Sequence, residues 1–234
     1  LYEAIYHAGV HNKANVKIKW IDSETINKKN VGELLSKAAG ILIPGGFGNR
    51  GISGKIEAIR HARENQIPFL GICLGMQLSI IEFTKNVLKM KNSGSSEFGK
   101  HTNNVISLMT EWSKKNQKVK RTKENDLGAT MRLGSYPCYI KEKSLASKVY
   151  KKKLIHERHR HRYEVNPKYR SFIEKKGLVF SGFSKDKKLL EIIENKNHKW
   201  FLGVQFHPEL KSKPFKPHPI FFSFIKNSLI NKNA

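Results

Sequence analysis

Two short apolar segments, residues 40–44 and 68–72, each lead through a glycine-containing turn into a longer segment with helical periodicity. In residues 56–65 and 74–88 the apolar side chains recur every three or four positions, the spacing of one helix face. A strand followed by a helix, twice over at this spacing, predicts a parallel sheet covered by helices on both faces. We therefore expect the first half of the chain to be α/β.

The second half is richer in strand-like segments. They are predicted at residues 105–109, 119–122, 138–140, 156–165, 178–183, 189–194 and 200–206. Several are close enough in sequence to form hairpins, which predicts antiparallel strands. A final helix is expected from Pro219, and a half-buried strand over residues 16–20, where apolar side chains alternate with lysines. No internal repeat or linker interrupts the chain, so residues 1–234 are expected to form a single domain.

Charge is the most unusual bulk property of the chain. Its 44 Lys and Arg outnumber 19 Asp and Glu, giving a formal net charge of +25, so nucleic-acid binding is kept as an alternative function. Hydrophobic residues make up 38% of the chain, which argues against disorder. No apolar stretch is long enough to span a bilayer, so no membrane partner is expected. Only two cysteines and no secretory signal pattern favour the cytoplasm.

Cys73 is the central residue of the segment 71–77, Gly-Ile-Cys-Leu-Gly-Met-Gln, where a strand is predicted to become a helix. Glycines two residues before and after a nucleophile permit a tight turn that exposes its side chain at the carboxyl edge of the sheet. The positive end of the following helix favours the reactive thiolate. The pattern alone leaves two interpretations, a nucleophile or a buried cysteine that only packs. Cys138 has no flanking glycines and is interpreted as a packing residue.

A partner for Cys73 follows the last predicted strand. His207 comes at the end of that strand and Glu209 two residues later, so the carboxylate can hold one ring nitrogen and fix the tautomer. This order predicts a Cys73, His207 and Glu209 triad. The glycine-rich turn at residues 45–48 should lie at the same sheet edge, where its N–H groups and that of Leu74 can stabilise an oxyanion. The turn has the spacing of neither common phosphate-binding loop.

Residues 157–166 read Glu-Arg-His-Arg-His-Arg-Tyr-Glu-Val-Asn. In a strand, Arg158, Arg160 and Arg162 share one face, and His159, His161 and Tyr163 share the other. A His-x-His pair can ligate a metal, but no third ligand accompanies it, so no metal site is expected. The arginine face suits a nucleic acid, solvent, or a carboxylate gripped by two N–H groups.

Six segments together carry a resemblance to a known family. Residues 45–48, 71–77 and 206–209 resemble the motifs of the class-I glutamine amidotransferases, and residues 95–98, 130–134 and 157–166 resemble the glutaminase domain of the CTP synthase family. The similarity runs from residue 1 to about residue 227. It implies an α/β fold with a mostly parallel central sheet flanked by helices and additional antiparallel strands in the second half.

The resemblance implies catalytic roles for individual residues. Cys73 is expected to attack the side-chain amide of L-glutamine, His207 to transfer the protons, and Glu209 to orient His207. The backbones of Gly46 and Leu74 match positions that contact glutamine and line the oxyanion hole.

Further residues match positions that bind ligands. Gln77, Glu97 and Arg162 are expected to hold the glutamine. Charge complementarity assigns Glu97 to its α-ammonium group and Arg162 to its α-carboxylate. Phe47 and Arg50 are candidates for a lid over GTP, a possible activator.

The resemblance also implies partners outside this domain. Ammonia would pass to a synthase domain of the same polypeptide, which aminates UTP with ATP and Mg²⁺, while the glutaminase itself is expected to need no cofactor. The full enzyme is expected to be a homo-oligomer. The synthase domain and the first strand of the family, expected just before the opening helix, are not among the 234 residues. The alternatives are the glutaminase of another amidotransferase, another cysteine-elbow enzyme such as a peptidase or deglycase of similar fold, or a basic protein that binds nucleic acid, although no specific nucleic-acid partner is expected for the glutaminase itself.

Overall fold

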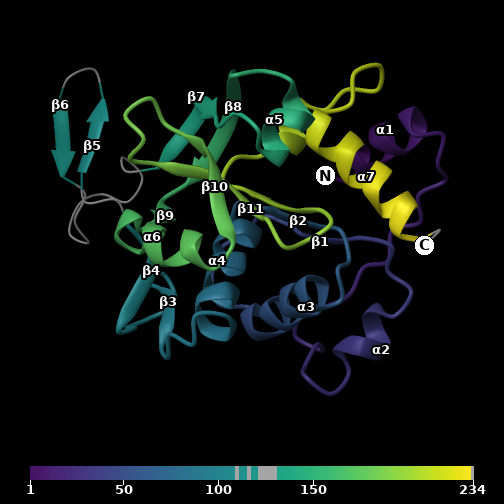
Figure 1. Ribbon diagram of the computed structural model, residues 1–234, viewed down its shortest axis with the longest axis horizontal. Helices are drawn as coiled ribbons and strands as arrows, with labels where there is room; N and C mark the ends of the chain where they lie inside the picture. The colour runs from purple at the N-terminus through teal and green to yellow at the C-terminus, as the bar shows by residue number, and fades with distance from the viewer. Residues whose placement is uncertain (109–110, 115–116, 121–130, 233–234) are drawn as a thin grey trace.

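A computed structural model describes residues 1–108, 111–114, 117–120 and 131–232. Among them, seven strands form the main sheet, in the order β1-β2-β12-β11-β10-β7-β8 (Figure 1). In that order their bounds are Ile41–Ile43, Phe69–Ile72, Phe201–Val204, Leu190–Asn195, Leu178–Phe183, Arg132–Ile140 and Leu154–His161. β2 pairs in parallel with β1 and β12, and the remaining neighbours are antiparallel. In this sheet, antiparallel pairing among the described strands is confined to the second half, as expected, but β12 of that half pairs in parallel with β2. Only two of the six pairings between described strands are parallel, so the sheet is mixed and not mostly parallel as predicted.

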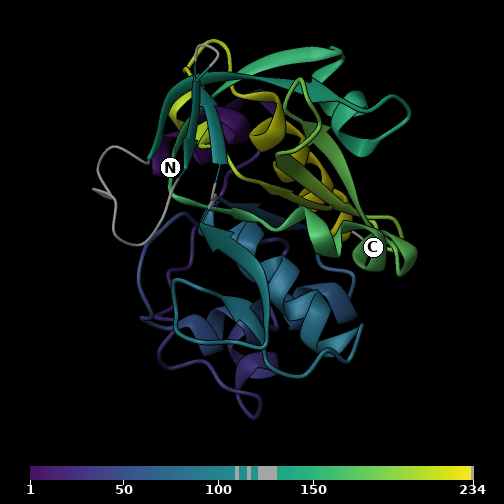
Figure 2. The ribbon, with the colours of Figure 1, turned by 90° about the vertical axis from the view of Figure 1, so that its left-hand side faces the viewer.

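Helices cover both faces of this sheet. One face carries α1 (Tyr2–His11), α5 (Leu145–Tyr150) and α7 (Pro219–Lys232). The opposite face carries α2 (Val31–Leu35), α3 (Ile52–Glu64), α4 (Leu74–Asn86) and α6 (Arg170–Lys175). Figure 2 shows the two layers, with the blue helices of the first half on one side and the yellow C-terminal helix on the other. The α/β fold with flanking helices is therefore confirmed.

Smaller elements complete the described chain. A second sheet has the order β3-β4-β9, with bounds Ser93–Ser95, Asn103–Leu108 and Tyr163–Val165. β5 (Glu111–Lys114) pairs with β6 (Gln117–Lys120). Two 3₁₀ turns, η1 (Pro167–Tyr169) and η2 (Pro208–Lys211), follow β9 and β12. Predicted positions 109 and 121–122, and residue 130 of the segment 130–134, lie outside the described residues.

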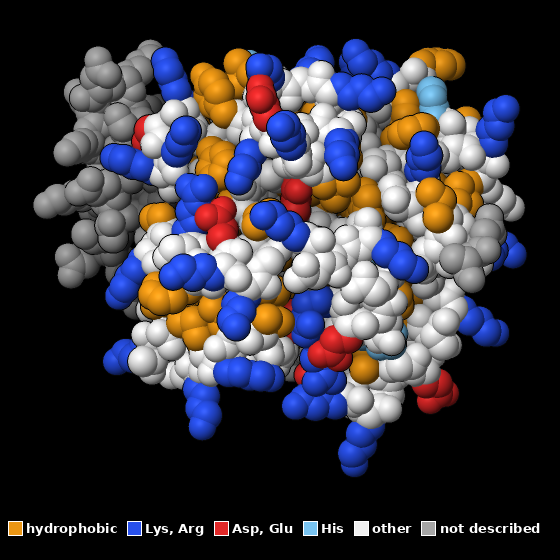
Figure 3. Space-filling view, viewed as in Figure 1, with side chains coloured by type: hydrophobic (Ala, Val, Ile, Leu, Met, Phe, Trp, Pro, Cys, Tyr) orange, Lys and Arg blue, Asp and Glu red, His pale blue; other side chains and the backbone are white. Residues whose placement is uncertain are grey.

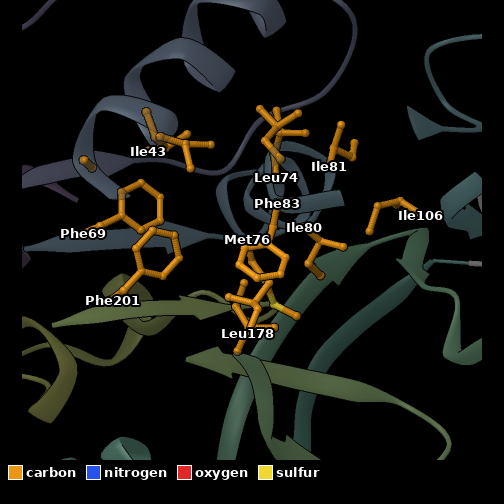
Figure 4. Close-up of a cluster of buried hydrophobic side chains, with 14 of the residues drawn as sticks. Ile43, Phe69, Leu74, Met76, Ile80, Ile81, Phe83, Ile106, Leu178 and Phe201 are labelled. Atoms are coloured by element: carbon orange, nitrogen blue, oxygen red, sulfur yellow. The ribbon is translucent and has the colours of Figure 1, made fainter. Parts of the chain in front are cut away.

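The core beneath the candidate site is built around α4. Residues Leu74 to Thr84 of this helix are all buried, because the helix lies between the main sheet and the β3-β4-β9 sheet. Figure 4 shows Phe69 and Phe201 together, and their ring centroids are 4.4 Å apart. Each fully buried side chain of this size contributes about 1.5–3 kcal/mol of hydrophobic stabilisation. The packing fixes the N-terminal end of α4 against the ends of the parallel strands.

The strand predicted over residues 16–20 is wrong. Val16 and Ile18 are half-buried and the lysines exposed, so the alternation is correct there, but Trp20 is exposed and the segment pairs with no described strand. Both residues line a groove of about 890 Å³ that Ile41 and Ile43 of β1 also line. Because the groove separates the segment from β1, no hydrogen-bond ladder forms between them.

Candidate active site

Cys73 lies in the turn between β2 and α4. Its backbone has φ +50° and ψ −101°, a conformation that residues other than glycine seldom adopt. The adjacent glycines make room for the turn: a Cβ on Gly71 would lie 2.7 Å from the carbonyl carbon of Gly75, and one on Gly75 would collide with the carbonyl oxygen of Ile43. The amide of Cys73 donates to the carbonyl of Val204 at 2.7 Å, which ties the turn to β12. The predicted strand-to-helix turn is confirmed.

The thiol of Cys73 is less acidic than the sequence predicts from its position at a helix end. Burial raises the pKa of its thiol to about 12, while the backbone N–H of Leu74 acts in the opposite direction. The carboxylates of Glu209, Glu164 and Glu97 raise it further. Desolvation therefore outweighs the positive helix end, and the resting side chain is a thiol that needs a base.

His207, held by Glu209, is the candidate for that base. Nδ1 of His207 lies 2.7 Å from Oε1 of Glu209, so the Nδ1–H donates to the carboxylate and Nε2 carries the free lone pair. Nε2 is buried and has no hydrogen-bond partner among the described residues. A Cβ placed on Gly45 would lie 2.7 Å from Cε1 of His207 and 3.5 Å from Cβ of Cys73. The structure thus brings the predicted triad together around a glycine that leaves space for both side chains.

The predicted oxyanion residues are neighbours. A Cβ on Gly46 would lie 3.4 Å from a side-chain carbon of Leu74, so the glycine turn lies over the start of α4. The N–H of Gly48, in the same turn, donates to Oε1 of Glu97 at 3.1 Å. The glycine turn therefore joins the start of α4 to one of the predicted glutamine-binding residues.

Glu97 and Arg162 lie close enough to interact. Burial raises the pKa of Glu97, and the N–H of Gly48 and the positive charge of Arg162 act against that rise. Arg162 occupies the junction between β8, which ends at His161, and β9, which begins at Tyr163. A carboxylate and a guanidinium at one site offer opposite charges to a zwitterionic amino acid.

Gln77 points into the protein. Its Nε2 donates to the carbonyl of Tyr163 at 3.0 Å and to Oε1 of Gln205 at 3.2 Å. Both amide hydrogens are thereby committed, so the predicted contact with glutamine falls to Oε1 of Gln77.

The predicted lid residues are not brought to the triad. Phe47 is 57% exposed. Arg50 is largely exposed and pairs with Glu24 at 2.7 Å and with Asp22 at 3.8 Å. Neither makes a described contact with the catalytic side chains.

The basic segment of β8 alternates as predicted. Arg158 and Arg160 are exposed, whereas Glu157, His159 and His161 are buried. In the part of the chain that the structure describes, no group of three or more His, Cys, Asp or Glu side chains is arranged to hold a metal ion. Figure 3 shows Lys and Arg spread over the visible face, with no single dense patch.

One residue in contact with Cys73 was missed from the sequence. Nε2 of the buried Gln205 lies 3.7 Å from Sγ of Cys73. The available signal was its position two residues before His207, since side chains two apart in an extended segment point the same way. Cys138 is buried against β10 and β11, and a Cβ on Gly182 would lie 2.9 Å from its sulfur, so its interpretation as a packing residue is confirmed.

Comparison with known sequences places the chain among glutamine-dependent enzymes. The sequence profile of the glutamine amidotransferase class-I family matches residues 1–227. Proteins named CTP synthase from Pelagibacter ubique and Paramagnetospirillum magneticum are 58% and 53% identical to the chain over 97% and 96% of its length. The chain spans 42% of the length of each of these two relatives.

Solved structures agree with the sequence comparison. The glutaminase domain of Trypanosoma brucei CTPS, determined with bound acivicin, superimposes with a TM-score of 0.87 at 35% identity, covering 98% of this chain and 86% of that one. A protein from Thermoplasma acidophilum, named as a GMP synthase subunit, has a TM-score of 0.56 at 14% identity and shares the fold. No helix in the described part of the chain has the length and apolar character needed to cross a bilayer.

Proposed function

The chain belongs to the class-I glutamine amidotransferases, and on that premise we propose that it hydrolyses the side-chain amide of L-glutamine at Cys73. The observation that carries the proposal is the position of Cys73 on a strained turn, next to the His207 and Glu209 pair. Gly45 lies against both Cys73 and His207. A buried thiol next to an oriented imidazole has the arrangement of a nucleophile and its base.

The first half of the reaction forms a thioester. His207 accepts the thiol proton at Nε2 while Sγ of Cys73 attacks the carboxamide carbon of glutamine. The resulting oxyanion accepts hydrogen bonds from the N–H groups of Gly46 and Leu74. His207 then gives its proton to the leaving nitrogen, which departs as ammonia. Glu209 stabilises the imidazolium that exists between the two transfers.

The second half regenerates the enzyme. His207 takes a proton from water, whose oxygen attacks the γ-glutamyl thioester, and the thiolate of Cys73 leaves and is reprotonated. The product is glutamate. Glu97 binds the α-ammonium group and Arg162 the α-carboxylate, which presents the carboxamide end of the substrate to Cys73.

The ammonia has a further use in the complete enzyme. By analogy with the relatives named CTP synthase, we propose that it passes to a synthase domain of the same polypeptide, where UTP is aminated to CTP with ATP and Mg²⁺. GTP as an activator near Phe47 and Arg50, and a homo-oligomeric full enzyme, belong to the same proposal. Two free, buried cysteines suit a reducing cytoplasm.

Ammonia release from glutamine by the chain, alone and joined to a synthase domain, tests the proposal. Acivicin labelling, located by mass spectrometry, should modify Cys73. Cys73→Ala should abolish both signals, whereas Cys138→Ala, the matched change at the other buried cysteine, should retain them. A wild-type protein that neither releases ammonia nor labels at Cys73 in either form would exclude the proposed function.

Binding to nucleic acid is less well supported. Lys and Arg are dispersed over the face in Figure 3, whereas a dedicated site concentrates them along one surface. Binding that survives moderate salt and prefers one sequence would favour this alternative.

A further inference from the structure

Gln205 contacts the proposed nucleophile, yet it has no part in the proposed reaction. Its side chain is fully buried, and its Nε2 lies 3.7 Å from Sγ of Cys73, a hydrogen-bond distance for sulfur. An N–H donor interacts more strongly with a thiolate than with a thiol. The contact therefore strengthens as Cys73 loses its proton.

The orientation of the Gln205 amide is fixed by its other end. Oε1 of Gln205 accepts a hydrogen bond from Nε2 of Gln77 at 3.2 Å. A carboxamide that accepts on its oxygen side presents its NH₂ group on the opposite side. The bond from Gln77 thus directs the N–H donor of Gln205 toward Cys73.

Gln77 is in turn anchored through a backbone carbonyl. The carbonyl of Tyr163 accepts from Nε2 of Gln77 at 3.0 Å and lies 3.1 Å from Nδ1 of His161. Because a carbonyl can only accept, His161 carries its hydrogen on Nδ1. Nε2 of His161 is then the acceptor for Nδ1–H of His159, 2.9 Å away.

The chain of contacts ends in buried charges. Nε2 of His159 lies 3.5 Å from Oε2 of Glu191 without a hydrogen bond, because a neutral ring with its hydrogen on Nδ1 has only a lone pair at Nε2. Arg132 donates to Glu191 at 2.7 Å and to Glu164 at 3.2 Å, and all three side chains are almost fully buried. Rearranging such a cluster would leave a charge unpaired in the interior, so it forms a rigid base for the chain.

We propose, on the basis of the glutaminase function, that Gln205 is a positioning residue for Cys73. Its amide holds the sulfur for attack and stabilises the thiolate, and the hydrogen bonds that link His161, Tyr163 and Gln77 to Gln205 keep the amide directed at the sulfur. The carboxylates of Glu209, Glu164 and Glu97 all oppose the thiolate. The N–H groups of Leu74 and Gln205 are the donors that counter them.

The test compares Gln205→Met with Gln66→Met. Gln66 is a matched control, because its amide bonds the backbone of Asn197 and Lys199 at the opposite end of β2. Gln205→Met should lower kcat for ammonia release about 10- to 100-fold, the usual effect of losing a hydrogen bond to a charged group, with KM nearly unchanged. Gln66→Met should retain wild-type kcat.

Alkylation of Cys73 by iodoacetamide without glutamine distinguishes positioning from a merely structural role. Loss of the donor makes the thiolate rarer, so Gln205→Met should be alkylated about tenfold more slowly at a fixed pH. A variant whose site had only loosened would expose the buried sulfur and be alkylated faster.

Variants of His161 test the part of the hydrogen-bond network that lies beyond Gln77. The amide introduced by His161→Asn can place an N–H near the position of Nδ1, whereas His161→Leu offers no donor. We expect His161→Asn to retain most of kcat and His161→Leu to lose it in the same direction as Gln205→Met. Folding of each variant is checked by its urea unfolding midpoint.

The outcomes separate the two proposals. A wild-type protein without ammonia release or acivicin labelling overturns the glutaminase function, and the alkylation rates still test the role of Gln205. If the wild type is active, a Gln205→Met variant with wild-type kcat, or with faster alkylation than Gln66→Met, overturns the positioning role. Slower alkylation together with a selective loss of kcat supports it.

Discussion

Cys73 is predicted to remain a protonated thiol until glutamine binds. Burial raises its pKa from the ordinary 9.0 to about 12. At pH 8 the thiolate is then about one part in 10,000, against about one part in ten for an exposed cysteine. Only the thiolate attacks a neutral electrophile. Native Cys73 should therefore react with iodoacetamide at least about 1000-fold more slowly than Cys73 in the unfolded chain.

The assay is alkylation between pH 7 and pH 10, in buffer and in urea, followed by mass spectrometry of the peptide that contains Cys73. The rate for the unfolded chain should reach half its maximum near pH 9 and level off toward pH 10. The native rate should keep rising about tenfold per pH unit across the whole range. Restricted access of iodoacetamide to the buried sulfur lowers the native rate by the same factor at every pH. The change of that rate with pH therefore still reports the pKa of Cys73. A native plateau below pH 8 would refute the reasoning, because it would require a preformed thiolate.

Acivicin, used as a glutamine-mimicking electrophile, provides the contrast. Its binding places the electrophile where His207 can accept the thiol proton, so Cys73 should be labelled readily at pH 7.5. His207→Gln should remove this labelling while leaving the iodoacetamide rate nearly unchanged. Equal loss of both reactions would mean that His207 acts on the structure of the site and not as its base.

Three further perturbations test the site and its support. Glu209→Gln keeps the shape of the side chain but removes the charge that stabilises the His207 imidazolium, so kcat for ammonia release should fall about 10- to 100-fold; an unchanged kcat would exclude the orienting role. Gly45→Ala places a methyl group 2.7 Å from Cε1 of His207 and should lower ammonia release, whereas Gly32→Ala, which meets nothing within 4 Å, should not; equal activities would contradict the close approach. Arg132→Met leaves Glu164 and Glu191 buried without their cation and should lower the free energy of unfolding by about 3–5 kcal/mol in urea. Lys153→Met, which breaks the exposed pair with Glu142, should leave the free energy of unfolding nearly unchanged; similar losses would show that the buried cluster is not a rigid base.

The local elements could be predicted because their signals are local. The apolar runs that form β1 and β2, the helical spacing of α3 and α4, and the glycines around Cys73 all act through neighbouring residues. The spacing of His207 and Glu209 likewise predicted the contact between their side chains, because the two residues are only two positions apart. Residues 16–20 show the limit of such signals, since alternation gives the face of a side chain but not the distance to a pairing strand.

The roles of the buried histidines needed the tertiary structure. The sequence placed His159 and His161 on one face of a strand, which was correct, but gave no partner for either ring. Their neighbours come from other elements. His159 lies next to Glu191 of β11, and His161 shares the carbonyl of Tyr163 with Gln77 of α4. Contacts between residues so far apart in sequence have no periodicity to reveal them.

The sequence by itself determined the α/β order of elements and the turn that presents Cys73, and it predicted the residues proposed as the triad. The tertiary structure decided the protonation state of Cys73, the contact with Gln205, and the pairing of Arg50 with Glu24 and Asp22. The physical reason is desolvation: the charge state of a group depends on what surrounds it in space. The helix end next to Cys73 is visible in the sequence, but the burial that outweighs it is a property of the packed protein.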